Sequence, residues 1–362
     1  MRTAEAGADS AAGARPAGKG RTPGGARSAQ DVLAWSRGLT APALRAAVDG
    51  LPGSLRRLAG YHFGWWDERG TPTEADSGKA LRPALVLLSA SAIGGAPAGA
   101  VPAAVAVELV HNFSLLHDDV MDGDATRRHR PTAWAVFGVN AAILAGDALL
   151  TLAFDVLAHS GHPAVPEAGR ALGAAVVDLL AGQSVDLAFE ERAEVGLAEC
   201  VGMAAAKTGA LLGCSAGLGA MFAGGRPDRV GHVTEFGRQL GLAFQYVDDL
   251  LGIWGDPLVT GKPVHSDLTS RKKSLPVVAA LGTGTPAGRE LAALYCDDRP
   301  LAGADLARAA KLIELTGARN WCRAEADRLL VSALGSLVQA RPATRARAEL
   351  TNLARLAVRR DR

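Results

Sequence analysis

Apolar residues recur at helical spacing along most of the chain, and turns rich in glycine and proline separate the apolar runs. The sustained alternation of apolar and polar residues that is typical of strands does not occur. Two of the helical runs are Leu109, Val110, Phe113, Leu116 and Leu240, Leu242, Phe244, Val247. Their spacing predicts core helices, and the whole pattern predicts an all-α protein.

Two uncharged, apolar stretches could be mistaken for membrane spans. Glycine and proline interrupt the first, 83–107, so it predicts two core helices joined by a turn. The second, 208–225, carries three glycines at four-residue spacing, which lets helices approach closely. Because Lys207 stands at its head, we expect a tightly packed helix of a soluble protein and no transmembrane segment.

Residues 1–30 consist mainly of Ala, Gly, Arg and Ser, with almost no large apolar side chains. Such a segment cannot bury enough surface to fold, so it predicts a disordered tail. Its basic, acid-poor composition is also found in transit peptides, although biased composition explains it equally well. No linker divides the rest, and residues 31–362 are therefore predicted to form one all-α domain.

The composition sets broad limits on function. Of the 362 residues, 48% are hydrophobic and 21% charged, and the formal net charge is +2. These values allow one large core and do not point to nucleic acid. The four cysteines are widely spaced, which argues against zinc and disulfides and fits the reducing cytoplasm.

Two aspartate clusters lie at the ends of apolar helical runs. Asp118, Asp119 and Asp122 fall close together on the first predicted helix, and Asp248 and Asp249 end the second. Buried carboxylates must be paired or bind metal. Mg2+ is usually held by one or two carboxylates plus substrate phosphates. The clusters therefore predict two carboxylate walls that bind Mg2+ and face one cavity.

Basic residues follow each cluster. They are Arg127 and Arg128 after the first, and Lys262, Arg271, Lys272 and Lys273 after the second. Cations beside such dense anions imply an additional, anionic partner, and the planar fork of arginine suits phosphate oxygens. A diphosphate bridged by Mg2+ to the aspartates explains both signs of charge, and a surface salt-bridge network is the alternative.

Further segments complete the pattern. They are Gly78-Lys79-Ala80-Leu81-Arg82-Pro83, His111, Gly182-Gln183-Ser184-Val185-Asp186, Lys207-Thr208 and Phe244-Gln245. With the aspartate clusters, in this order, the chain resembles the trans-isoprenyl diphosphate synthases of the polyprenyl synthetase family, and most of all its geranylgeranyl diphosphate synthases. The resemblance implies a single large helical bundle of the isoprenoid synthase type around a central apolar cavity, and a homodimer.

The resemblance also implies a role for each site residue. The Mg2+ ligands, for three ions per site, would be Asp118, Asp119, Asp122, Asp248 and Asp249. The allylic diphosphate would bind Arg127, Lys207, Lys262 and Lys272. Isopentenyl diphosphate would bind Lys79, Arg82, His111 and Arg128 without metal. The space in which the allylic cation forms would be lined by Thr208 and Gln245.

The implied activity is that of a Mg-dependent prenyltransferase. The allylic diphosphate ionises, and the double bond of isopentenyl diphosphate attacks the resulting cation. Loss of a proton then gives an all-trans prenyl diphosphate that is five carbons longer. The cavity must exclude water, because water would quench the cation.

The second cluster departs from the family pattern. The family usually has a third aspartate where this chain has Gly252, and Asp256 lies too far along the helix to replace it. Mg2+ keeps several waters, so we expect a water in place of the missing carboxylate and an active enzyme. His265 stands where the family usually has glycine, and we interpret it as an exposed loop residue.

Phe113 and Ser114 bear on product length. Phe113 lies five residues before Asp118, more than one helical turn deeper, where an aromatic residue forms the floor for the growing chain in the family. With the small Ser114 beside it, it resembles enzymes that make the twenty-carbon geranylgeranyl diphosphate. The fifteen-carbon farnesyl diphosphate is the next alternative, and plain core packing explains Phe113 equally well.

Two other functions fit parts of the pattern. A terpene cyclase on the same fold would ionise a diphosphate, but it has no use for a complete isopentenyl diphosphate pocket. A non-catalytic partner subunit of a prenyl synthase would not need the intact first cluster or Lys207-Thr208. The sequence therefore favours elongation of allylic diphosphates.

Overall fold

The computed structural model describes residues 25–73, 78, 80–257, 261, 263–296, 299 and 301–359. The elements are α1 (Ala29–Asp49), α2 (Gly53–His62), α3 (Leu81–Ile93), η1 (Pro97–Ala100), α4 (Val101–Met121), β1 (Thr126–Arg127), β2 (Arg130–Pro131), α5 (Ala133–Phe137), α6 (Val139–His159), α7 (Val165–Glu191), α8 (Leu197–Ala204), η2 (Ala205–Gly209), α9 (Ala210–Phe222), α10 (Pro227–Trp254), α12 (Ser266–Thr269), α13 (Leu275–Leu281), α14 (Pro286–Cys296), α15 (Ala304–Leu315), α16 (Ala318–Gln339) and α17 (Thr344–Val358). Helices dominate, and the all-α prediction is confirmed.

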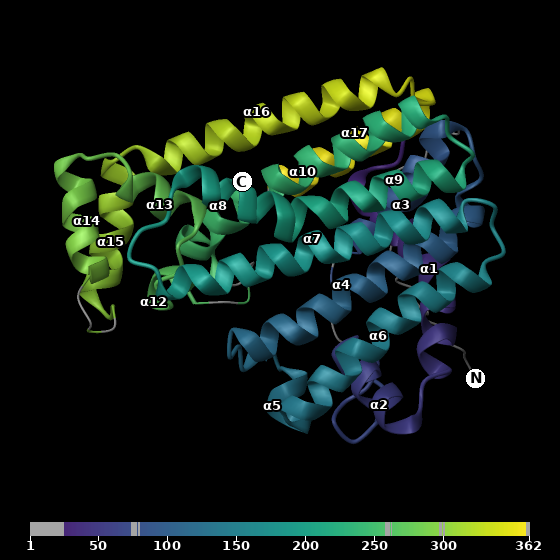
Figure 1. Cartoon of the computed structure of the whole chain (residues 1–362), viewed down its shortest axis with the longest axis horizontal. Coiled ribbons are helices and arrows are strands. Elements are labelled where there is room, and N and C mark those ends of the chain that lie inside the picture. The colour runs from purple at the N-terminus through teal and green to yellow at the C-terminus, as the bar shows by residue number, and fades with distance from the viewer. Residues whose placement is uncertain are drawn as a thin grey trace, which may run out of the picture.

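Helices α3 and α9 contribute to two of the three hydrophobic clusters that form the core of the described residues. The first cluster also contains residues of α8, α10, α16 and α17, and the second contains residues of α2, α4, α6 and α7. Residues of α10 and of α12 to α16 form the third cluster. Almost every residue of α3 and α9 is buried, as expected of helices that are apolar on all sides. In Figure 1 the long helices run side by side, and α14 and α15 lie at one end of the molecule.

The apolar stretch 83–107 forms two helices, as predicted. Helix α3 ends at Gly94, whose φ of 99° is readily adopted by glycine, and Pro97 begins the short helix η1 that leads into α4. The turn thus directs α4 back through the core and brings its last turn, with the first aspartate cluster, to the site.

The glycine-rich stretch 208–225 packs closely against α10, as predicted. A Cβ atom at Gly213 would lie 3.2 Å from the Thr234 carbonyl oxygen, and one at Gly217 would lie 2.5 Å from Thr234 Oγ1. Helix α9 begins only at Ala210, because the preceding residues form the π-helix η2.

Among the described residues, four helical segments are long and apolar enough, by length and composition, to cross a membrane: Pro97–Met121, Val139–His159, Val165–Glu191 and Leu197–Phe222. The most apolar part of the first is 72% buried inside the protein, whereas the corresponding parts of α6 and α7 are only 33% and 39% buried. Helices α6 and α7 therefore leave an apolar surface uncovered in the single chain.

Residues 1–24 of the predicted tail lie outside the described residues. Helix α1 begins at Ala29, within the range predicted for the tail, and the Oγ of Ser28 accepts a hydrogen bond from the Asp31 N–H at 3.1 Å. Arg27 forms an ion pair of 2.6 Å with the buried Glu349 of α17. The folded part therefore begins a few residues before the predicted boundary.

Candidate active site

The last turn of α4 carries the first aspartate wall. The N–H of Asp122 donates to the Asp118 carbonyl oxygen at 2.8 Å, so helical geometry extends one residue past the end of α4. Asp118 and Asp122 therefore share a helix face, as predicted. Asp119 is only 1% exposed, and its Oδ1 accepts a hydrogen bond from Arg127 Nε at 2.7 Å and lies 2.7 Å from Arg127 Nη2 in an ion pair. Asp119 thus already has a cationic partner.

Burial governs protonation of the first wall. It raises the pKa of Asp118 to about 6 against the attraction of Lys207, and repulsion by Asp122 acts in the same direction as burial. Burial also raises the pKa of Asp119 to about 6, although Arg127 opposes it. The Oδ2 atom of Asp119 is buried without a hydrogen-bond partner in the described part of the chain. A bound cation would stabilise the ionised form of these carboxylates.

Two lysines lie between the walls. Nζ of Lys207 is 2.7 Å from Asp186 Oδ2, and Nζ of Lys272 is 3.8 Å from the same atom. Burial would lower the pKa of Lys272, but the carboxylates of Asp186, of the second wall and of Asp122 raise it above its ordinary value. Lys272 therefore interacts electrostatically with carboxylates of both predicted walls.

A π-helix presents Lys207. The five residues of η2 separate α8 from α9, and such segments often occur at functional sites. Helix α7 approaches so closely that a Cβ atom at Gly182 would lie 2.4 Å from the Lys207 nitrogen. This approach brings Asp186 of α7 to the lysines. Asp186 had no predicted role, although it ends the predicted motif Gly182 to Asp186, which marked it as a candidate.

Asp249 of the second wall accepts a hydrogen bond on each carboxylate oxygen. This residue is 4% exposed, its Oδ1 accepts hydrogen from Gln245 Nε2 at 2.7 Å, and its Oδ2 accepts hydrogen from the Leu275 N–H at 2.8 Å. Burial raises the pKa of Asp249 to about 7. Through these two hydrogen bonds Asp249 joins α10 to α13.

Thr208 and Gln245 come together as predicted. Thr208 Oγ1 donates to Gln245 Oε1 at 2.6 Å, although the two residues lie on η2 and α10. Because Gln245 also donates to Asp249, a chain of hydrogen bonds links the π-helix to the second wall. Polar oxygens from two elements thus lie side by side next to the wall.

Asp267 of α12 occupies the place of the missing third aspartate. A Cβ atom at Gly252 would lie 2.2 Å from one carboxylate oxygen of Asp267 and 2.6 Å from the other. The second wall therefore has a carboxylate at this position after all, supplied from fifteen residues further along the chain. The prediction for this position was a water, and Asp267 had no predicted role. His265, expected to be an exposed loop residue, is half-buried and has a φ of 65°.

The residues predicted for isopentenyl diphosphate gather beside the first wall. Burial and the charges of Arg82 and Arg128 lower the pKa of His111 well below its ordinary range. Burial raises the pKa of the neighbouring Glu108, although Arg82 opposes it. A Cβ atom at Gly78 would lie 2.5 Å from Arg128 Nη2. Three of the four predicted residues, Arg82, His111 and Arg128, therefore lie in one group. His62 also belongs to this group, but the sequence did not predict it.

His62 was missed because it stands apart from every motif. It lies at the end of α2, 3.1 Å from Asn112 Oδ1, and lines a small pocket with Arg127 and Arg128. Two other predicted residues, Lys79 and Lys262, lie outside the described residues.

Phe113 lies within the core of the α4 side of the molecule. It is 2% exposed, and its ring centre is 4.8 Å from that of His117 in an edge-to-face contact. The hydroxyl of Ser114 donates to the His111 carbonyl oxygen at 2.8 Å. Phe113 is thus buried one turn below Asp118, at the depth from which it was predicted to limit the chain.

The donor set fits Mg2+ in the presence of a diphosphate. In the described ranges no three His, Cys, Asp or Glu side chains form a ready-made metal site. The site instead offers single carboxylates on opposite walls, with an unpartnered oxygen on Asp119. Mg2+ is usually held in this way, by one or two carboxylates plus substrate phosphates.

The polyprenyl synthetase family matches residues 71–313. The chain is 48% identical to the (2E,6E)-farnesyl diphosphate synthase of Mycobacterium tuberculosis, over 91% of this chain and 93% of that protein. It is 46% identical to the geranylgeranyl diphosphate synthase of the same organism, over 85% of this chain and 89% of that protein. The likeness thus extends about equally to both kinds of enzyme, whereas the motifs had suggested mainly the second.

Solved structures of polyprenyl synthetases also resemble this chain. A polyprenyl synthetase from Streptomyces coelicolor superposes with a TM-score of 0.87 at 47% identity, over 91% of this chain and 99% of that chain. A geranylgeranyl pyrophosphate synthase from Corynebacterium glutamicum, complexed with isoprenyl diphosphate and magnesium, superposes with a TM-score of 0.75 at 27% identity, over 92% and 97%. The chain therefore belongs to the polyprenyl synthetase family and is a Mg-dependent enzyme that elongates prenyl diphosphates.

Proposed function

We propose that the enzyme condenses an allylic diphosphate with isopentenyl diphosphate and releases geranylgeranyl diphosphate, acting in the cytoplasm as a homodimer. The observation that carries this proposal is the separation of two cationic groups. Lys207 and Lys272 lie between carboxylate walls, while Arg82 and Arg128 lie in a group of their own. An elongating enzyme needs both groups, because it binds two diphosphates of different roles.

The first group serves the allylic diphosphate. Lys207, Lys272 and Arg127 would bind its oxygens, with Lys262 from outside the described residues. Asp118, Asp122 and Asp248, with Asp267 beside them, would hold three divalent ions. Bound ions would supply further positive charge, which stabilises the departing diphosphate.

The protein then controls the cation and the proton. The allylic carbon–oxygen bond breaks, and its electron pair leaves with the diphosphate. The polar oxygens of Thr208 and Gln245, which are 2.6 Å apart, would lie next to the cation. The double bond of isopentenyl diphosphate attacks, and a proton passes to the released diphosphate. Burial of the surrounding helices excludes water, which would otherwise quench the cation.

Incubation with Mg2+, isopentenyl diphosphate and each allylic diphosphate, followed by product analysis, tests the proposal. We expect an allylic product five or more carbons longer. Hydrocarbon from the allylic diphosphate alone, without elongation, would instead identify a terpene cyclase. No reaction under any condition, in a folded protein, would support a non-catalytic partner subunit.

Product length depends on the residue below Asp118. The buried position of Phe113 supports a floor for the twenty-carbon chain, while the 48% identity to a farnesyl diphosphate synthase supports the fifteen-carbon alternative. Phe113→Ala is predicted to shift the products toward longer chains, because it removes the floor. Chromatography of the dephosphorylated products measures this shift. An unchanged distribution would leave Phe113 with a packing role only.

A second copy of the chain would cover the apolar surface of α6 and α7. Its large exposed side chains are Val139, Ile143, Leu144, Phe154, Val177, Leu180 and Val185. Exposed apolar side chains gathered on two helices are typical of an interaction site. This surface supports a homodimer and explains why the two helices are apolar enough to suggest a membrane.

A further inference from the structure

The β1–β2 hairpin that carries Arg127 and Arg128 has an unfavourable turn. Arg127 pairs with Arg130 across the hairpin, and the two central residues, Arg128 and His129, have φ values of 51° and 61°. A two-residue turn with positive φ at both positions favours Asn and Gly, because a Cβ atom destabilises this conformation. Contacts from outside the hairpin must therefore hold it.

Arg130 provides such contacts. Its Nη1 donates to the Tyr61 carbonyl oxygen and its Nη2 to the Trp66 carbonyl oxygen, each at 3.2 Å. The guanidinium carbon lies 4.4 Å from the centre of the Tyr61 ring, and the Tyr61 hydroxyl donates to the Pro131 carbonyl oxygen at 2.8 Å. These contacts join strand β2 to the end of α2 and to the loop after it.

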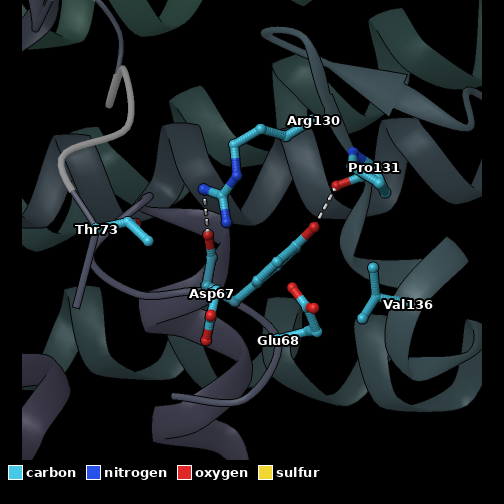
Figure 2. A pocket seen from close by; sticks show the side chains of 7 residues that line it. Asp67, Glu68, Thr73, Arg130, Pro131 and Val136 are labelled. Carbon is cyan, nitrogen blue, oxygen red and sulfur yellow. Dashed lines mark hydrogen bonds between the residues drawn. The ribbon is translucent and has the colours of Figure 1, made fainter. Parts of the chain in front are cut away.

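Figure 2 shows this junction from the side of a pocket of about 490 Å³. In Figure 2, Arg130 and Pro131 lie on one side of the pocket. The dashed lines mark the hydrogen bond from Arg130 to the Tyr61 carbonyl oxygen and the one from the Tyr61 hydroxyl to the Pro131 carbonyl oxygen. Arg130 also lines the small inner pocket that contains Arg128 and His62. Arg130 therefore lies between the outer pocket and the proposed isopentenyl diphosphate group.

The turn determines where Arg128 points. The Arg128 guanidinium lies against Gly78, where a Cβ atom would approach to 2.5 Å. Burial and the positive charges of Arg82 and Arg128 all lower the pKa of His111, so Arg128 belongs to the same group as Arg82 and His111. A change in the turn would move Arg128 out of this group while leaving Asp118 and its neighbours on α4 in place.

We propose that Arg130 is a positioning residue for isopentenyl diphosphate. Arg130 joins β2 to α2 and to the loop after α2. These contacts stabilise the left-handed turn, and the turn directs Arg128 toward Gly78. This inference rests on the proposed function, because it assigns isopentenyl diphosphate to the group around Arg128. It predicts a larger effect on isopentenyl diphosphate than on the allylic diphosphate, because Arg127 of the same hairpin is also held by its ion pair with Asp119.

Steady-state kinetics of the full-length enzyme with Mg2+ tests the inference. Arg130→Ala is expected to raise the KM for isopentenyl diphosphate about tenfold, with kcat and the KM for the allylic diphosphate within about twofold of the unchanged protein. Arg130→Lys and Tyr61→Phe, which each remove only part of the junction, should raise the same KM by less. In the Arg130→Ala background, His129→Gly should lower this KM again, because glycine favours the turn.

Arg45→Lys is the matched control. Arg45 lies 4.6 Å from the ring centres of Trp65 and Trp66, so it contacts the same loop from α1 without reaching the hairpin. It should leave both KM values unchanged. If Arg130→Ala does not fold, the KM for isopentenyl diphosphate of Arg130→Lys and Tyr61→Phe tests the inference instead.

An unchanged KM for isopentenyl diphosphate in folded variants, or an equal rise of both KM values, would overturn the inference. A wild-type protein that does not elongate would instead overturn the proposed function.

Discussion

At the scale of single residues, carboxylates of one site differ because burial and cations compete. Two lysines outweigh burial at Asp186, and the pKa of Asp186 falls below its ordinary value. Burial outweighs Lys272 at Asp249, and the pKa of Asp249 rises to about 7. Asp186 is therefore a permanent counter-charge for Lys207 and Lys272, whereas the buried wall carboxylates ionise fully only with a cation.

The Asp267 carboxylate fills the side-chain space of Gly252, so any side chain there must displace this carboxylate. Alanine in a helix interior normally gains about 0.5–1 kcal/mol over glycine. Gly252→Ala should instead lower the melting temperature and weaken binding of Mn2+, a spectroscopic substitute for Mg2+, because its methyl group would displace the Asp267 carboxylate. Differential scanning fluorimetry and electron paramagnetic resonance measure the two effects.

Gly231→Ala is the control for Gly252, since it lies on the same helix with nothing within 4 Å of an added Cβ atom. It should raise the melting temperature and leave Mn2+ binding unchanged. If both variants behave alike, the contact with Asp267 does not explain the glycine.

His62 should make stability depend on pH. Burial and the charges of Arg128 and Arg127 lower the pKa of His62 to about 3, although the hydrogen bond with Asn112 opposes them. The unfolded chain binds a proton below about pH 6.5 that the folded protein cannot accept. Stability is therefore lost as the pH falls from about 6.5, by at most about 1.4 kcal/mol per pH unit.

His62→Gln removes this loss. The melting temperature of the variant should rise relative to the wild type as the pH is lowered from about 7.5 to about 5, because only the wild type carries the histidine. Parallel curves of melting temperature against pH would show that His62 titrates alike in the folded and unfolded states.

At the scale of elements, small residues decide how closely the helices that carry the site approach. Gly182 lets α7 reach the Lys207 backbone, and a Cβ atom at Gly241 of α10 would lie 2.7 Å from the Gly209 Cα atom. These approaches place the π-helix between α7 and α10. Lys207 and Thr208 can thus reach Asp186 and Gln245 with short bonds.

Gly219 is predicted to tolerate no side chain. A Cβ atom there would lie 2.0 Å from the Val86 carbonyl oxygen of α3, and a backbone atom cannot move aside by rotation. Gly219→Ala should therefore destabilise the fold by about 1–3 kcal/mol, as overpacking does. Gly202→Ala, with open space on α8, should be neutral or stabilising. Urea unfolding measures both, and equal stability of the two variants would contradict the packing argument.

At the scale of the whole molecule, a single chain leaves some of its apolar helix surfaces exposed. Helices α3 and α9 are enclosed, whereas α6 and α7 keep large apolar side chains at the surface. Helix α6 packs along α4 and also contacts α7. The α4 helix ends at the first wall, so a partner on this surface would also stabilise the site.

Leu144→Glu should convert the proposed dimer to monomers. Leu144 is 59% exposed on α6, and a charge there would be buried without a partner at the interface. Val331→Glu is the control, because Val331 is 70% exposed on α16, away from α6 and α7. Sedimentation velocity should find monomers for the first variant and dimers for the second. A wild-type monomer would refute the proposed homodimer.

Local spacing was enough to predict the helices and the first wall. The four-residue spacing of Asp118 and Asp122 places them on one face in any helix, and apolar periodicity marks α4 and α10 as core helices. Breaks at glycine and proline correctly divided 83–107 into two helices. These features depend on residues within a few turns of one another, so the sequence alone determines them.

The tertiary structure alone decided which distant residues meet. It placed Asp267 in the space beside Gly252, paired Arg127 with Asp119, and engaged both oxygens of Asp249 within the chain. Each contact depends on the angle between elements and on the size of the side chains at their crossing. Local periodicity holds no information on either quantity. The sequence pattern therefore showed only that an aspartate is missing at Gly252, and the fold placed the Asp267 carboxylate there.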